Sequence, residues 1–217
     1  FGLFEVNDAC EILNLFPIDT DVFELITNEE ILYFRPYSFP CVTNDLHGKN
    51  PKTIRFELEN KNNPRDISGI QKANTNVYII SKSTGLYKYK EGKFISYLES
   101  KTWSEKELNH IVKNKQQQLI VSNTNGNIFV IDDSKEFKII KKISKKEIIG
   151  NTITFLEAYN DYVIIGTDRG INFYKDNIIR FIDEEQGLEN KIFTSSNIDN
   201  DMLFIGTSKG YYKLDLL

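Results

Sequence analysis

The chain alternates short apolar runs with polar breaks along most of its 217 residues. The runs contain four to six residues, are rich in β-branched and aromatic side chains, and end at Gly, Asn, Asp, Ser or Lys. Such runs are typical of short strands joined by tight turns. We therefore expect an almost purely β structure, with at most a turn or two of helix near 104–112, where "SEKELNHIVKNK" begins like a helix.

One phrase recurs along the chain: an apolar run, a polar turn, a glycine and an apolar or aromatic return. Its glycines, which we call the marker glycines, are Gly85, Gly126, Gly170 and Gly210, separated by 41, 44 and 40 residues. A further copy begins at Gly2, 83 residues before Gly85, which is two repeat lengths. Glycine suits this place because the return strand is entered through a positive φ angle.

Each phrase has a further apolar run on either side, which makes four strands in a period of about 40 residues. Four short antiparallel strands repeated at this spacing are typical of a β-propeller blade. We expect an all-β propeller over 1–217, with about five repeats that form an arc of a larger ring. The approximate units are 1–16, 17–60, 61–100, 101–145, 146–187 and 188–217.

Two details follow from this division. Unit 17–60 lacks the marker glycine and reads as a degenerate copy with three strands. We expect Ile79, Val121, Ile164 and Phe204, or their immediate neighbours, to lie in the core, because they hold equivalent places before the marker glycines.

Several other functions do not fit the sequence. The stretch "GTDRGINF" matches neither phosphate-loop pattern, and a strand follows it where a helix would be needed. The net charge is -4, and the basic stretch "KKISKK" at 141–146 reads as a solvated strand end or turn, so no cationic face for nucleic acid is expected.

The residue types for a metal or catalytic centre are scarce. Two histidines, His47 and His110, and two cysteines, Cys10 and Cys41, have no metal-ligand spacing, and whether the cysteines pair stays open. We expect no catalytic residue, no metal and no cofactor. No apolar run reaches the roughly 18–20 residues of a membrane span, and neither an initiating Met nor a signal peptide is present, so we expect a piece of a longer protein whose membrane contact lies elsewhere.

One segment resembles a known family. Residues 181–215, "FIDEEQGLENKIFTSSNIDNDMLFIGTSKGYYKLD", are similar to the two-component regulator propeller repeat, in which a Gly-Leu…Asn connector precedes a "WIGT" strand and a glycine return. Here the connector is Gly187, Leu188 and Asn190, and Phe204 replaces the usual Trp. The resemblance is clear over 78–217 and weak over 17–76.

The resemblance implies a role and a location. Members of the family are typically extracytoplasmic N-terminal halves of hybrid two-component sensors, chiefly in Bacteroidetes, ahead of a transmembrane helix and a cytoplasmic histidine kinase, and many respond to glycans. It therefore implies a periplasmic or extracytoplasmic, non-catalytic module that senses a small-molecule ligand, with an oligosaccharide as one candidate. Nucleic acid is not an expected partner.

Two alternatives stay open. The first is a WD40-like protein-interaction scaffold, although the Gly-His and Trp-Asp dipeptides are absent and Trp103 is the only tryptophan. The second is a propeller-based glycan lyase or hydrolase. Carboxylate pairs such as Asp132-Asp133 and Glu184-Glu185 exist, but adjacent strand residues point to opposite faces and cannot share a substrate atom.

The expected ligand site follows from propeller geometry, in which the turns between second and third strands and the connectors between blades share one face. Trp103, in a polar connector, offers an aromatic face for a sugar ring. Arg169 can clamp a carboxylate. The remaining candidates on these turns and connectors are Asp168, Lys209, Lys82 and Asn190. Unpaired edge strands of an open ring invite association, so a homodimer is also considered.

Overall fold

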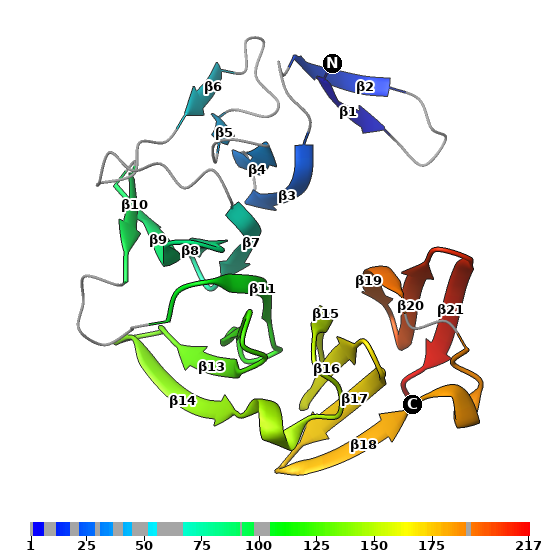
Figure 1. The fold of residues 1–217 in the computed structure, drawn as a ribbon. Coiled ribbons are helices and arrows are strands. Elements are labelled where there is room, and N and C mark those ends of the chain that lie inside the picture. Colours follow the sequence, from blue (N-terminus) through cyan, green and yellow to red (C-terminus); the bar gives the residue numbers. More distant parts are fainter. Residues whose placement is uncertain are drawn as a thin grey trace.

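The computed structural model describes an arc of small antiparallel sheets (Figure 1). It describes the backbone of residues 2–6, 12–17, 22–28, 31–36, 41–44, 52–55, 67–91, 93–97, 105–189 and 192–217, and side chains within these ranges from residue 67 onward. The cysteines and His47, for which the sequence left questions open, lie outside the described side chains.

Four sheets have four strands each, and every strand pairs with its neighbours in sequence. They are β3 (Val22–Asn28), β4 (Ile31–Pro36), β5 (Cys41–Asn44) and β6 (Lys52–Arg55); β7 (Ile67–Ala73), β8 (Asn76–Ser81), β9 (Gly85–Lys90) and β10 (Lys93–Ser96); β11 (Leu108–Lys113), β12 (Leu119–Asn123), β13 (Ile128–Asp132) and β14 (Lys138–Ile143); and β15 (Ile153–Tyr159), β16 (Tyr162–Thr167), β17 (Gly170–Lys175) and β18 (Ile178–Ile182). A three-stranded sheet follows, with β19 (Phe193–Asp199), β20 (Met202–Thr207) and β21 (Gly210–Asp215). The hairpin of β1 (Gly2–Val6) and β2 (Ile12–Pro17) stands at the other end of the arc.

The first strands of successive sheets lie side by side along the inside of the arc: β3 contacts β7, β7 contacts β11, β11 contacts β15, and β15 contacts β19 (Figure 1). This radial arrangement of four-stranded antiparallel sheets is a β-propeller, and the predicted fold class is confirmed. We call each sheet a blade. The prediction of three strands for unit 17–60 was wrong, because β3 precedes the three strands that were recognised.

Helical structure is limited to two single turns of 3-10 helix among the described residues, η1 (Lys145–Glu147) and η2 (Glu184–Gln186). Both turns lie in connectors between blades, and each begins at a capping side chain, that of Ser144 or Asp183. Near 104–112, where the sequence allowed a turn or two of helix, the described residues 105–107 are not helical and β11 follows, because the apolar residues Leu108 and Ile111 pack in the core of the blade.

The core is divided into layers that lie between neighbouring blades. One layer joins the β7–β10 and β11–β14 blades, a second joins β11–β14 and β15–β18, and a third joins β15–β18 and β19–β21. Ile79, Val121 and Ile164 are fully buried, which confirms their predicted place. Phe204 is only half-buried, while its neighbours Leu203 and Ile205 are fully buried. Each blade therefore covers the next one's apolar face, as stacked repeats must.

The repeated Ile-Gly-Thr phrase has a separate physical reason at each position. Ile165 is buried in the layer between blades. Gly166 faces Phe155 across the β15–β16 ladder, and a Cβ at Gly166 would overlap the Phe155 ring. Thr167 Oγ1 accepts the N–H of Arg169 at 3.2 Å and so caps the turn. All four marker glycines have positive φ, from 78° at Gly126 to 146° at Gly170, as predicted.

Candidate functional site

The turns between the second and third strands of each blade all lie at one face of the arc, because alternate turns of an antiparallel sheet lie at opposite ends. We call this the B–C face. Four of the predicted ligand-binding residues lie on it: Lys82 in the β8–β9 turn, Asp168 and Arg169 in the β16–β17 turn, and Lys209 in the β20–β21 turn. Trp103 and Asn190 lie outside the described residues.

Asp168 holds the connector that leads into its own blade. Its Oδ1 accepts the backbone N–H groups of Asn151 at 2.6 Å and Thr152 at 3.2 Å. These hydrogen bonds, that of Asn151 above all, hold the pKa of the Asp168 carboxyl below its ordinary value. Asp168 therefore anchors a connector to a turn, and its contact with a ligand stays a prediction.

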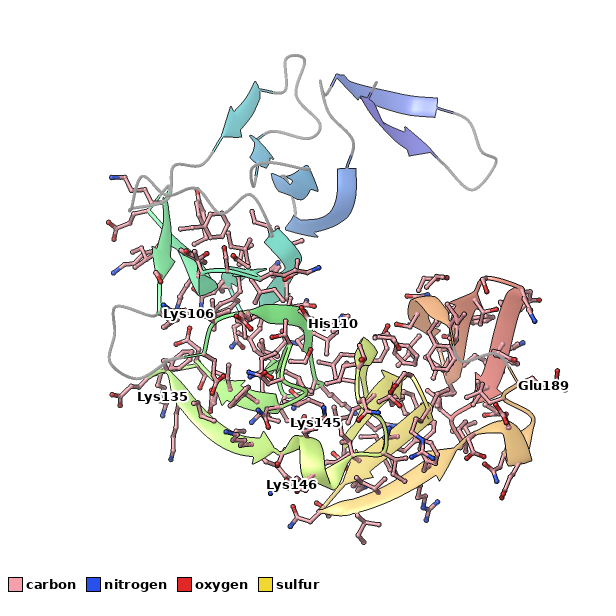
Figure 2. All side chains as sticks on the ribbon, viewed as in Figure 1. Lys106, His110, Lys135, Lys145, Lys146 and Glu189 are labelled. Atoms are coloured by element: carbon pink, nitrogen blue, oxygen red, sulfur yellow. The ribbon has the colours of Figure 1, made fainter. Side chains whose placement is uncertain are left out.

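Lys82 lies near the inner strands of the arc. Burial chiefly lowers the pKa of His110 on β11, and the positive charge of Lys82 lowers it further. His110 Nε2 lies 3.3 Å from the carbonyl oxygen of Ile153 on β15, so the ring bridges two neighbouring blades. Figure 2 shows His110 at the inner side of β11. The side chains of Lys82 and Arg169 are exposed.

Lys209 lines a cavity of about 260 Å³ at the end of the β19–β21 blade. The other lining residues are Glu189, Thr207, Gly210, Tyr211 and Tyr212. Glu189 comes from the connector, and Figure 2 shows it beside this blade. The structure thus brings Lys209 together with the connector, while Lys82, Asp168 and Arg169 share the face without lining this cavity.

A groove that the sequence did not indicate opens at the opposite face, between the β11–β14 and β15–β18 blades. Its volume is about 240 Å³, and the turns that border it are β11–β12, β15–β16 and β17–β18. Asn160 and Asp176 in two of these turns have φ angles of 50° and 51°. Asn and Asp are common at such positions of two-residue turns, and they were the sequence signal that could have located the turns bordering the groove.

A third cavity, of about 320 Å³, lies between β15–β18 and the chain's last residues and includes Tyr159, Tyr162 and Arg180.

The two carboxylates of the adjacent pair Asp132-Asp133 have separate structural partners. Asp132 accepts the backbone N–H of Ser134 within its own turn. Asp133, whose side chain is 8% exposed, accepts hydrogen bonds from Tyr78, Tyr97 and Lys88 of the preceding blade. Burial and the bonds to Asp133 raise the pKa of both tyrosines well above their ordinary value. Neither carboxylate is placed to share a substrate with the other.

Another carboxylate, partly buried, lies on an inner strand. Glu157 on β15 accepts a hydrogen bond of 2.7 Å from the hydroxyl of Ser196 on β19. Burial raises the pKa of Glu157, and the bond from Ser196 partly offsets this.

The side chains described from residue 67 onward contain no group of three or more His, Cys, Asp or Glu that could hold a metal ion. Within the described residues, no helix is long and apolar enough to cross a membrane.

Comparison with known proteins gives structural matches only. The extracellular domains assigned to the hybrid two-component systems BT3049 and BT4673 of B. thetaiotaomicron match with TM-scores of 0.70 and 0.71, both at 16% sequence identity. The matches cover 94% and 90% of this chain but only 30% and 29% of the two solved domains. The WD40 domain of Pan2 from Neurospora crassa matches with a TM-score of 0.62 and 14% identity, over 91% of this chain and 63% of that one. Neither a family model nor a curated protein matches the sequence.

These matches agree with the propeller fold. The first two are sensor domains and the third is a WD40 domain, so they differ in role while sharing an architecture. At such low identities a shared fold does not carry a shared function. The role of this chain must therefore be argued from its own surfaces and contacts.

Proposed function

We propose that the chain is a ligand-sensing propeller module from the extracytoplasmic part of a two-component sensor, without catalytic activity of its own. The observation that supports this most directly is the structural likeness to the BT3049 and BT4673 extracellular domains over at least 90% of the chain. The Gly-Leu…Asn connector and the Ile-Gly-Thr strands, which resemble the sensor propeller repeat, point the same way. A histidine kinase in the parent protein is part of this proposal.

Contacts between inner strands offer a means of relay. Ser68 Oγ on β7 donates to the carbonyl of Leu108 on β11 at 2.6 Å. The His110 ring and the bond from Ser196 to Glu157 join the next two pairs of inner strands. From the β7–β10 blade to the β19–β21 blade, each blade is thus tied to its neighbour by a side chain as well as by apolar packing. A ligand that contacts two blades can change their relative tilt, and these ties would transmit the change.

The ligand is proposed to be a small molecule, with an oligosaccharide as the candidate class, bound at the B–C face. The Lys209 cavity supports this because Tyr211, with 74% of its surface exposed, offers an aromatic ring beside ammonium and carboxylate groups. An exposed aromatic face can stack on the apolar side of a sugar ring while the polar groups bond its hydroxyls. Trp103 and Asn190, which lie outside the described residues, remain candidates from the sequence.

Calorimetric titration of the chain with a panel of oligosaccharides tests this site. We expect at least one oligosaccharide to bind saturably, the substitution Tyr211→Ala to weaken its binding about tenfold, and Ile178→Ala, at an exposed position on the outer strand β18, to leave it unchanged. Chromatography of the mixtures should show no product. Cleavage of the ligand would favour the lyase or hydrolase alternative, and a panel without any binder would contradict the glycan proposal.

The likeness to the Pan2 WD40 domain supports one competing function, a protein-interaction scaffold. The parent gene separates the two. A signal peptide upstream and a transmembrane helix followed by a kinase downstream are expected for the sensor. A parent protein that carries neither would favour the scaffold.

We also propose that the arc is completed by further blades or by a second copy of the chain. The outer face of the β19–β21 blade supports this, because it leaves Phe204 half-buried, whereas Ile79, the equivalent of Phe204, is fully buried. Analytical ultracentrifugation of the isolated chain should show association that increases with concentration. A monomer at all concentrations would mean that the isolated chain is stable as a closed or self-sufficient unit.

A further inference from the structure

The groove opposite the B–C face has walls that come from two different blades. The β11–β14 blade supplies Lys141, together with the amide side chains of Asn114 and Gln118. The β15–β18 blade supplies the carboxylates of Asp161 and Asp176 and the tyrosines Tyr162 and Tyr174. A ligand in the groove would therefore contact both blades at once.

The floor of the groove is apolar. Ile120, Val130 and Val163, which line it, belong to the packed layer between the two blades. A volume of about 240 Å³ is below the range of about 300–1,000 Å³ that is usual for drug-sized ligands. The groove thus suits a small ligand with a compact apolar part.

The charges of the two walls are opposite in sign. The Lys141 ammonium lies 4.5 Å from the centroid of the Tyr174 ring, and it forms no salt bridge among the described side chains. Among the same side chains Asp176 also forms no salt bridge, and Asp161 pairs with Lys175 at 3.1 Å. The Lys141 ammonium, which lies over the Tyr174 ring, therefore borders the groove from one blade, and two carboxylates with the single ammonium of Lys175 border it from the other, so the two walls carry net charges of opposite sign.

The polar groups of the groove are held in place before any ligand arrives. Asn114 Nδ2 donates to Gln118 Oε1 at 2.8 Å, and the hydroxyl of Tyr174 donates to Asn177 Oδ1 at 2.9 Å. The Lys175 ammonium is held between Asp161 and the ring of Tyr162, whose centroid is 5.1 Å away. Such preorganisation reduces the conformational entropy that binding would otherwise cost.

We infer that this groove binds a small zwitterion of the α-amino acid class with an apolar side chain. Its carboxylate pairs with Lys141 on one blade, its ammonium pairs with Asp176 and Asp161 on the other, and its side chain lies on Ile120, Val130 and Val163. The site goes beyond the sensor function proposed above, because it lies at the opposite face from Lys209 and uses none of the residues expected there. Two charge pairs across the groove would draw the two blades together.

The probe for this site is L-leucine, with two analogues that each lack one charge. These are 4-methylpentanoate, without the amino group, and 3-methylbutylamine, without the carboxylate. Calorimetry should show saturable binding of L-leucine with a dissociation constant below about 1 mM. Each analogue should bind at least about tenfold more weakly, because one blade then has no charge partner.

Substitutions in the chain locate the binding. Lys141→Met keeps the aliphatic stem and removes the charge, and we expect it to weaken L-leucine binding about tenfold or more. Lys142→Met is the matched control, because Lys142 is on the same strand but lies over the ring of Phe129 and does not line the groove. Asp176→Asn should weaken binding as well, and Asn tolerates the φ of 51° at this position.

Three results would overturn the inference. The first is the absence of saturable L-leucine binding by a chain that unfolds cooperatively in urea. The second is equal binding of L-leucine and 4-methylpentanoate. The third is binding that Lys141→Met and Lys142→Met affect alike. Glycan binding at the B–C face is measured separately with Tyr211→Ala, so the failure of either site is distinguishable from the failure of the other.

Discussion

The hydroxyl of Tyr78 donates a hydrogen bond of 2.6 Å to the carboxylate of Asp133, a residue 55 positions later in the chain and in the next blade. The same oxygen, Oδ2, accepts a second bond of 2.6 Å from Tyr97 and an ion pair of 2.9 Å from Lys88. Three donors from the β7–β10 blade thus converge on one partly buried carboxylate of the β11–β14 blade. This polar cluster ties the outer parts of the two blades, where the inner-strand contacts do not reach.

The substitution Asp133→Asn is expected to destabilise the chain by about 1–3 kcal/mol, because a partly buried ammonium and two phenols lose their charged acceptor. Urea unfolding followed by circular dichroism measures the change. Asp132→Asn, at the adjacent position, is the control and should have a small effect, because Asp132 bonds only within its own turn among the contacts described. Similar losses in the two variants would contradict a special role for Asp133.

Replacement of Ile164 by Ala should cost about 2–5 kcal/mol, since the side chain is fully buried between the β15–β18 and β19–β21 blades. Ile178→Ala removes the same atoms from a side chain that is 65% exposed, and a change within about 0.5 kcal/mol is expected. The unfolding free energies of the two variants, compared in urea, test the burial of Ile164. A cost near zero would remove Ile164 from the core.

The glycine of the Ile-Gly-Thr phrase can be tested at Gly166. We expect Gly166→Ala to destabilise the chain by about 1–3 kcal/mol, because the new methyl group would overlap the ring of Phe155. The double variant Gly166→Ala with Phe155→Leu should recover part of this loss relative to the sum of the single variants, as coupled neighbours do. Strictly additive losses in a thermal or urea unfolding series would mean that the two residues do not compete for space.

The stability of the chain should depend on pH through His110. Burial and the charge of Lys82 lower its pKa in the folded chain below the unfolded value of 6.5, so the unfolded chain binds the proton more readily. The stability that neutral His110 contributes is therefore present above pH 6.5 and is lost as the pH falls through its folded pKa. The His110→Gln variant keeps a donor for the Ile153 carbonyl. As the pH falls from 6.5 through the folded pKa of His110, the free energy of unfolding of this variant should decrease less than that of the parent chain.

The measurement for His110 is urea unfolding of both proteins at several pH values from 7.5 down to about 5. Glu157 titrates with the opposite sign, because its raised folded pKa makes its contribution disappear as the pH rises through that value. This contribution is common to both proteins and cancels in the comparison. Parallel pH profiles for the parent chain and His110→Gln would show that the imidazole does not titrate on unfolding.

The sequence by itself determined the repeat and hence the fold. Apolar runs of strand length and the spacing of Gly85, Gly126, Gly170 and Gly210 predicted the blades, because the period and the turn requirement are local properties of the chain. The same pattern predicted that Ile79, Val121 and Ile164 would be buried. Only strand β3 was missed, in the unit without a marker glycine.

Only the tertiary structure decided which side chains meet. Asp133 and Tyr78 are far apart in sequence, and the pairing of Lys141 with the Tyr174 ring depends on how two blades stack. The sequence placed the candidate residues on the B–C face, but Asp168 is bonded to a connector, and the cavity that Lys209 lines includes none of the other three described candidates. Contacts between blades depend on side-chain reach across a packed layer, and a one-dimensional period carries no information on that distance.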